Sequence, residues 1–321
     1  MMLNENCSLK EKVDCSIIIP VYFNEGLLFQ TMEDIYNDVV QKNPKLTFEV
    51  IFVDDGSGDN SFKELLIIKE KHPKLVKLIK LTRNFGQGNA SIAGLAHSKG
   101  DCSIGISADG QEPTSLINEM LNCYYNGDYE IIAGSRIGRD ESYYRILTSK
   151  FFYNIIKKIS FPGMPEGGFD CSLVSRKVIK YILNNHEDHL FMQGALLWPG
   201  FKTKYIDYRR LERKSGSSKW TFGKKITYFI DGIMSYSFLP IRIISLTGIL
   251  FSLFGFICAL LLLIQRVFRG HEIPGWSALM ILVLVTSGIQ MIMLGVIGEY
   301  LWRTLAQARN RPRYIIEKIY E

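Results

Sequence analysis

The chain has 321 residues, of which 47% are hydrophobic and 22% charged, and its formal net charge is +6. This composition excludes a disordered chain, and the six cysteines lack the paired spacing of a disulfide framework or a zinc site. The mild basic excess suits a surface that faces anionic lipid or a phosphorylated substrate, and no tract is typical of nucleic-acid binding, so we expect no nucleic-acid partner.

Short apolar runs alternate with helical patterns over the first 133 residues. Strands are expected at 16–22, 48–53, 76–81, 102–107 and 130–133, and helices at 25–42, 60–72, 88–97 and 113–125. This alternation predicts an α/β fold with a mostly parallel sheet that helices cover on both faces. Ligands of such sheets bind at the carboxyl ends of the strands.

Those strand ends are rich in carboxylates, amides and glycines. Asp54 and Asp55 can accept hydrogen bonds from a nucleotide base or ribose, or they can form an Asx-turn with Gly56. Arg83 offers a guanidinium to a phosphate, or it forms a surface salt bridge. Asp109 is either a ligand of a divalent metal ion or the cap of the following helix. Together these ends predict a site for an anionic, hydroxylated ligand.

The C-terminal third contains two long uncharged stretches, residues 243–265 and 273–298. Each is long enough to cross about 30 Å of hydrocarbon, so we expect two membrane spans. Basic residues flank the pair of spans more densely than the loop between them, which predicts that both termini are cytoplasmic. The expected organisation is a soluble domain (1–221), an amphipathic interface region (222–242), a transmembrane hairpin (243–301) and a cytoplasmic tail (302–321).

Several segments occur in the order seen in one enzyme family. They are SIIIPVYFNE (16–25), FVDDGSGDNS (52–61), LTRNFGQGNASIAGL (81–95), SADGQEP (107–113), AGSRIGRDES (133–142), GGFDCSLVSRKV (167–178) and RLERKSGSSKWTFGKK (210–225). With the two expected spans, the chain resembles, over nearly its whole length, the GT-A glycosyltransferases of family 2 that act on polyprenyl phosphates. This group includes dolichyl-phosphate mannose synthases and bactoprenol glucosyltransferases.

The resemblance implies a Rossmann-like GT-A catalytic domain with interface helices and two C-terminal transmembrane helices in the cell membrane. It implies inverting transfer of a sugar from a nucleotide sugar, with uridine favoured over guanosine, to a polyprenyl-phosphate lipid at the cytoplasmic face. Such enzymes need Mg²⁺ or Mn²⁺. Relatives form tetramers, so a homo-oligomer is expected.

The resemblance also assigns roles to individual residues. Asp109 would hold the metal ion, and Asp170 would lie near the acceptor, where it orients the acceptor phosphate or takes its residual proton. The positions that match the nucleotide-sugar site are Pro20, Tyr22, Glu25, Asp54, Asp55, Arg83, Ser107, Ala108 and Gln111. The positions that match the acceptor-phosphate loop are Arg210, Arg213, Ser218, Lys219 and Trp220.

Three positions depart from the family pattern. Ser107 replaces the first Asp of the usual Asp-x-Asp, Ser172 replaces an Arg, and Gln193 stands where a basic residue is common. One protein carboxylate can still suffice, because Mg²⁺ often binds through one or two carboxylates and the substrate phosphates. Two alternatives stay open: a processive polysaccharide synthase, which would need more spans and a Gln-x-x-Arg-Trp motif, and a non-catalytic membrane scaffold, which the serine prompts.

Overall fold

The structure is a computed structural model that describes residues 12–136, 157, 161–165, 168–185, 191–211, 222–269 and 275–321. It divides the chain into two compact units. The sheet unit comprises Met1–Lys225 and Pro312–Glu321, and the helical unit comprises Ile226–Arg311.

The sheet unit is built on one eight-stranded sheet with the order β7-β5-β6-β4-β1-β2-β3-β8. Six strands run in the same direction: β1 (Cys15–Val21), β2 (Phe48–Asp54), β3 (Val76–Leu81), β4 (Cys102–Gly105), β5 (Ile131–Arg136) and β7 (Thr203–Tyr208). The other two, β6 (Phe169–Ser175) and β8 (Ile316–Tyr320), run antiparallel to their neighbours. The predicted mostly parallel sheet is therefore confirmed.

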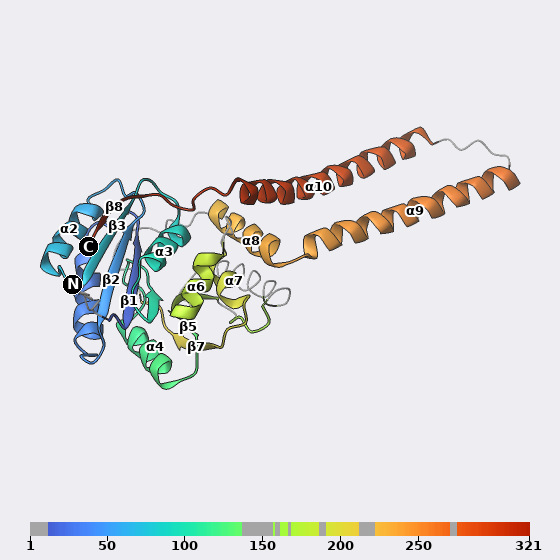
Figure 1. The fold of residues 1–321 in the computed structure, drawn as a ribbon. Helices are drawn as coiled ribbons and strands as arrows, with labels where there is room; N and C mark the ends of the chain where they lie inside the picture. The colour runs from blue at the N-terminus through green and yellow to red at the C-terminus, as the bar shows by residue number, and fades with distance from the viewer. Residues whose placement is uncertain are drawn as a thin grey trace, which may run out of the picture. The chain divides into compact units, whose positions relative to one another are not determined.

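Helices cover both faces of this sheet, as predicted (Figure 1). They are α1 (Leu28–Ile35) with a π-helical continuation (Tyr36–Val40), α2 (Ser61–Lys71), α3 (Gln87–Ala96), α4 (Thr114–Asn126), α6 (Arg176–Asn184) and α7 (Met192–Leu197). Successive strand residues point to opposite faces. Ile17 and Ile19 accordingly pack in the core with α1, α2 and α4, whereas Ile18 packs with α3, α6 and α7.

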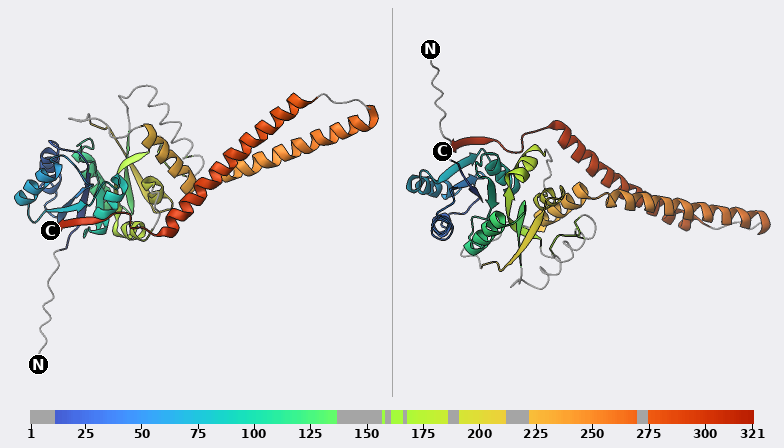
Figure 2. Two further views of the ribbon diagram at one scale, coloured as in Figure 1. Left: turned by 90° about the horizontal axis from the view of Figure 1, so that it is seen from above. Right: turned by 60° about the horizontal axis from the view of Figure 1, so that its bottom comes forward.

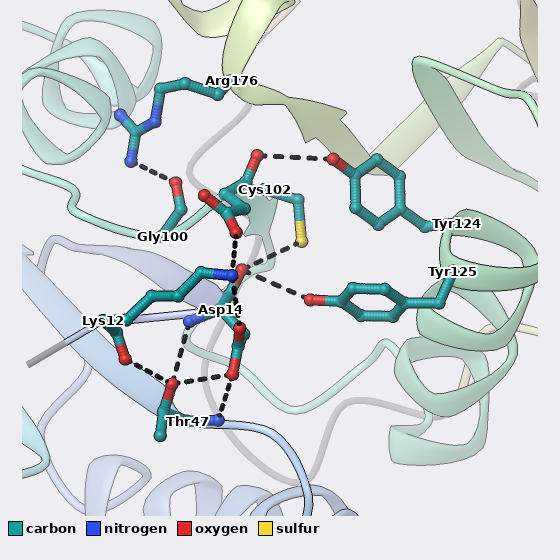
Figure 3. A network of polar contacts seen from close by, with 9 residues as sticks. Lys12, Asp14, Thr47, Gly100, Cys102, Tyr124, Tyr125 and Arg176 are labelled. Atoms are coloured by element: carbon teal, nitrogen blue, oxygen red, sulfur yellow. Dashed lines mark hydrogen bonds and ion pairs between the residues drawn. The ribbon is translucent and has the colours of Figure 1, made fainter.

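A polar network closes the amino end of the sheet (Figure 3). The Asp14 carboxylate accepts hydrogen bonds from the Thr47 backbone N–H at 2.8 Å and from its hydroxyl at 2.8 Å. Lys12 pairs with Asp101 at 3.1 Å, and the Tyr125 hydroxyl donates to the Asp14 carbonyl at 3.5 Å. Asp14, Thr47 and Asp101 each directly precede a strand, so the network ties three strand starts together, away from the edge where a ligand is expected.

The last strand, β8, was not predicted from the sequence. It pairs antiparallel with β3 and covers that edge of the sheet (Figures 1 and 2). Lys77 pairs with Glu321 at 2.7 Å and Lys80 with Glu317 at 2.9 Å. A bare edge strand exposes unpaired backbone groups, so β8 satisfies β3 with a segment from the far end of the chain.

The helical unit consists of most of α8 (Phe222–Tyr236) with α9 (Leu239–Arg269) and α10 (Trp276–Arg309). Within the described residues, one segment, Leu239–Cys258, is long and apolar enough to cross a membrane, and none of its residues is buried. The second expected span falls largely within α10 and stays a prediction. Arg303 of α10 pairs with Asp231 of α8 at 2.8 Å.

Replacing a core-facing residue of β8 tests how much this strand stabilises the sheet. Ile316 packs on the cluster of Ile51, Val53 and Ile79, whereas the adjacent Ile315 side chain is half exposed. We expect Ile316→Asp to destabilise the protein by about 1–3 kcal/mol, because a charged group enters an apolar contact. Thermal unfolding of the full-length protein in detergent would show a clearly lower Tm for Ile316→Asp than for Ile315→Asp. Equal Tm values would mean that β8 adds little.

Candidate active site at the carboxyl edge of the sheet

The parallel register brings several predicted site residues to one edge. Val21 at the end of β1 lies opposite Asp54 at the end of β2, and Ile18 of β1 lies opposite Gly105 at the end of β4. Antiparallel β6 begins at this same edge, because Ser172 lies opposite Gly105. The loops that follow β1, β2, β3 and β4 and the start of β6 therefore surround one region.

The two aspartates after β2 have different surroundings. The Asp55 carboxylate accepts hydrogen bonds from the backbone N–H groups of Phe85 at 2.7 Å and Gly86 at 2.9 Å, so it holds the loop that follows β3. Asp54 is fully buried; its Oδ1 accepts a long hydrogen bond of 3.3 Å from Ser57, and its Oδ2 has no hydrogen-bond partner in the described part of the chain. The bond from Ser57 supports the turn interpretation in part, and it leaves Asp54 Oδ2 buried with an unmet capacity to accept a hydrogen bond.

Gly56 allows the loops after β2 and β3 to touch. Its φ of +72° is in the left-handed region, and a Cβ there would lie 2.6 Å from the backbone carbon of Arg83. Arg83 itself is exposed and stacks on the Phe85 ring, with its guanidinium carbon 4.1 Å from the ring centroid. It forms no ion pair with the described residues, so the surface salt bridge is not seen and the guanidinium is accessible to a phosphate.

The residues after β1 are held by the start of α2. The Glu25 carboxylate accepts from the Asn60 side chain at 2.7 Å and from its backbone N–H at 3.0 Å, and these bonds lower the pKa of Glu25. Glu25 therefore has a structural partner in addition to its predicted nucleotide role. Pro20 lies near the end of β1, and Tyr22 packs edge-to-face on Phe23, with ring centroids 4.7 Å apart.

After β4, two carboxylates converge on one hydroxyl. Ser107 Oγ lies 2.6 Å from Asp109 Oδ1 and also contacts Glu112 Oε2, and the Ser107 backbone N–H donates to that same Oε2 at 3.1 Å. Asp109 and Glu112 are both buried. A serine hydroxyl has one proton to donate, so it satisfies only one carboxylate at a time. Pro113 occupies the N-cap of α4 without a side-chain cap, so Asp109 is not the cap of that helix.

The neighbouring residues of this turn contact two other segments. The Ala108 carbonyl accepts a hydrogen bond from Thr31 Oγ1 at 3.1 Å. Gln111 donates its backbone N–H to Asp109 Oδ1 at 3.3 Å and its side-chain Nε2 to the Leu211 carbonyl at 3.2 Å.

At the start of β6, Asp170 forms an ion pair with Arg136 at the end of β5. Beside them, β7 ends at Tyr208, which lies opposite Arg136 in the sheet register. Burial raises the pKa of Tyr208 to about 12; the negative charge of Glu112 adds to the shift, and Arg136 and Arg210 oppose it. Arg136 thus connects two neighbours at this edge, Asp170 through the ion pair and Tyr208 through the sheet register.

Some polar atoms near the end of β7 are buried and have no hydrogen-bond partner in the described part of the chain. They are the Tyr208 hydroxyl and Arg210 Nε. Gln193, which replaces the common basic residue, donates its Nε2 to the Phe169 carbonyl and so holds the backbone just before Asp170. Ser172 lies within β6, opposite Gly105 and Ala133. Four of the five predicted acceptor residues, Arg213, Ser218, Lys219 and Trp220, lie outside the described residues.

Sequence reasoning missed Glu112, Arg136 and Tyr208 as members of this group. Glu112 stands before a proline and resembles an ordinary residue of a helix start. Arg136 lies within a quoted family segment and ends a buried strand, which was the available signal. Tyr208 gave no signal, because only its pairing with β5 brings it to this edge.

The site can be assessed for a divalent metal ion from its donor chemistry. Asp109 and Glu112 present carboxylate oxygens, which are the ligands that Mg²⁺ and Mn²⁺ prefer. No group of three or more His, Cys, Asp or Glu side chains in the described residues can hold a metal ion. The residues present therefore fit an ion that takes its remaining ligands from substrate phosphates.

A methyl group at Gly56 should disrupt the contact between the β2 and β3 loops. We expect Gly56→Ala to lower the Tm, because the added Cβ meets backbone and the φ is unfavourable by about 1–2 kcal/mol. Gly58→Ala is the matched control, since its Cβ would lie 3.4 Å from the Phe23 ring. Thermal unfolding measures the Tm of each variant; equal Tm values for both variants would contradict a close contact between the two loops at Gly56.

Burial raises the pKa of Asp54, while its hydrogen bond from Ser57 opposes this shift. As pH rises above the usual value of 3.8, the unfolded chain loses this proton before the folded protein does. Folding stability contributed by Asp54 is therefore present at low pH and lost as pH rises through the raised pKa. We expect the Tm of Asp54→Asn minus that of wild type to increase from pH 4 to pH 7. A difference independent of pH would refute this.

Comparison with known proteins identifies the family. Residues 16–183 match Glycosyl transferase family 2. The chain is 34% identical to the uncharacterized glycosyltransferase YkcC of Bacillus subtilis over 97% of this chain and 96% of that protein. It is 32% identical to the bactoprenol glucosyl transferase of Shigella phage SfII over 94% of this chain and 97% of that protein.

Among solved structures, mannosyl-3-phosphoglycerate synthase from Rubrobacter xylanophilus aligns with a TM-score of 0.48 at 14% identity, covering 74% of this chain and 75% of that one. The sequence matches are decisive, because they extend over nearly the full length of chains that share at least 30% of their residues. This chain belongs to glycosyl transferase family 2.

Proposed function

We propose that this glycosyltransferase moves a sugar from a UDP-sugar to the phosphate of a polyprenyl lipid, with inversion at the anomeric carbon. The observation that carries the proposal is the meeting of two groups at one sheet edge: the Asp109–Ser107–Glu112 cluster and the Asp170–Arg136 pair. The lipid class follows from near-full-length similarity to proteins named bactoprenol glucosyl transferase.

The donor would bind along the ends of β1, β2 and β3. Asp54 Oδ2 is buried without a hydrogen-bond partner in the described part, so it can accept from a base N–H or a ribose hydroxyl. The exposed Arg83 guanidinium can contact the diphosphate. A resident Mg²⁺ or Mn²⁺, held by Asp109 with Glu112 nearby, would neutralise charge on the leaving diphosphate.

The acceptor would enter beside Asp170. An oxygen of the lipid phosphate attacks the anomeric carbon, the bond from that carbon to the nucleoside diphosphate breaks, and its electron pair leaves with the diphosphate. Asp170 holds the Arg136 guanidinium at the end of β5, and Arg210 comes two residues after Tyr208, the residue opposite Arg136 in the sheet register. Two guanidinium groups there reduce the repulsion between the approaching phosphate and the diphosphate.

The connectivity supports an even number of membrane crossings. The chain leaves the sheet unit before α9 and returns to it after α10, because β8 pairs with β3 in the same sheet. Both ends of the helical unit must therefore lie on one side of any membrane that it crosses. We propose that α9 and α10 each span the membrane, with the sheet unit and both termini cytoplasmic, and that several chains associate through these helices.

A donor screen tests the proposed reaction. Full-length protein in detergent is incubated with undecaprenyl phosphate, Mn²⁺ or Mg²⁺, and a panel of UDP- and GDP-sugars, and mass spectrometry detects lipid-phosphate-sugar. We expect one UDP-sugar to give a product that EDTA abolishes. Asp109→Asn should reduce the rate by at least about 100-fold, since a charge-stabilising group is lost.

The outcomes separate the alternatives. A polymer longer than one sugar would favour the processive synthase. No product from any donor, with UDP binding intact, would favour the scaffold. Full activity of Asp109→Asn would overturn the metal assignment without affecting the reaction class.

A further inference from the structure

One glutamine at the candidate site contacts both the Asp109 turn and the segment that follows β7. Leu211 donates its backbone N–H to the Gln111 carbonyl at 2.9 Å, and Gln111 Nε2 donates to the Leu211 carbonyl at 3.2 Å. The backbone N–H of the same glutamine donates to Asp109 Oδ1 at 3.3 Å. Two residues 100 positions apart thus exchange a pair of hydrogen bonds beside the predicted metal ligand.

We propose that Gln111 is a positioning residue that fixes Arg210 relative to Asp109. The donor and acceptor phosphates would then be held in the relative position that sugar transfer needs. This inference rests on the proposed function and deepens it. The paired bonds hold Leu211, and Arg210 is the preceding residue, so the start of the acceptor loop is tied to the Asp109 turn. Arg210 Nε is buried and has no hydrogen-bond partner in the described part, so an acceptor phosphate that reached it would supply the missing hydrogen bond.

The two ends of the Gln111 amide have separate uses. Its Nε2 donates to Leu211, and no described residue hydrogen-bonds its Oε1, which therefore keeps its capacity to accept a bond from a ligand. An amide that donates at one end and accepts at the other can serve both substrates at once. Nucleotide binding, the role implied by the family resemblance, would involve the oxygen, whereas the positioning role involves the nitrogen.

Two substitutions separate these roles. Gln111→Glu keeps an oxygen toward the donor but places a carboxylate oxygen against the Leu211 carbonyl, whereas Gln111→Met removes both polar ends at similar length. We expect both variants to raise the KM for undecaprenyl phosphate about 3- to 10-fold, which corresponds to the loss of one hydrogen bond. Binding of UDP with Mn²⁺ should stay within about twofold of wild type for the Glu variant. Gln41→Glu is the matched control, because Gln41 is exposed and lies far from Gln111 in the sequence.

Hydrogen exchange of the full-length protein supplies a readout that does not need turnover. The backbone amide of Leu211 should exchange faster in Gln111→Glu and Gln111→Met than in wild type or Gln41→Glu. Unchanged Leu211 exchange, or an altered UDP affinity with an unchanged acceptor KM, would overturn the positioning role. If wild type transfers no sugar, the proposed function fails, and the exchange experiment still decides whether the Gln111 side chain holds Leu211.

Discussion

The parallel pairing of β1 with β2 and β4 is the constraint on which the site depends. Parallel strands end at one edge, so the loops that follow them must meet there, however far apart they are in the chain. The polar network of Asp14, Thr47 and Asp101 closes the opposite edge and holds the strand starts in register. The candidate site and this structural network thus lie at opposite ends of one sheet.

Buried carboxylates at this edge differ in how fully the described residues satisfy their oxygens. Asp55 uses both oxygens on backbone N–H groups of the β3 loop, and Glu112 is tied to Ser107. Asp54 keeps one oxygen without a partner among the described residues, and the cost of burying that charge raises its pKa. A nucleotide that donates to this oxygen would offset that cost, which gives a physical reason for an otherwise unfavourable arrangement.

Ser107 illustrates how a departure from the family pattern can be accommodated. A serine cannot supply the carboxylate that usually stands at this position. Here its hydroxyl lies between Asp109 and Glu112, so a second carboxylate reaches the same place from five residues further along the chain. The neutral Ser107 side chain therefore still has two carboxylates beside it, Asp109 and Glu112.

Hydrophobic periodicity determined the alternating strands and helices, and the carboxylates and glycines at the strand ends indicated the edge with the site, because both signals are local. Tertiary structure alone decided that Arg136 and Tyr208 join Asp170, that Gln111 holds Leu211, and that the last five-residue strand completes the sheet. These contacts link residues far apart in the chain, and their energies depend on register and burial. Local sequence patterns do not determine which strands pair. The sequence alone could therefore indicate where the site lies, but not which distant residues come together in it.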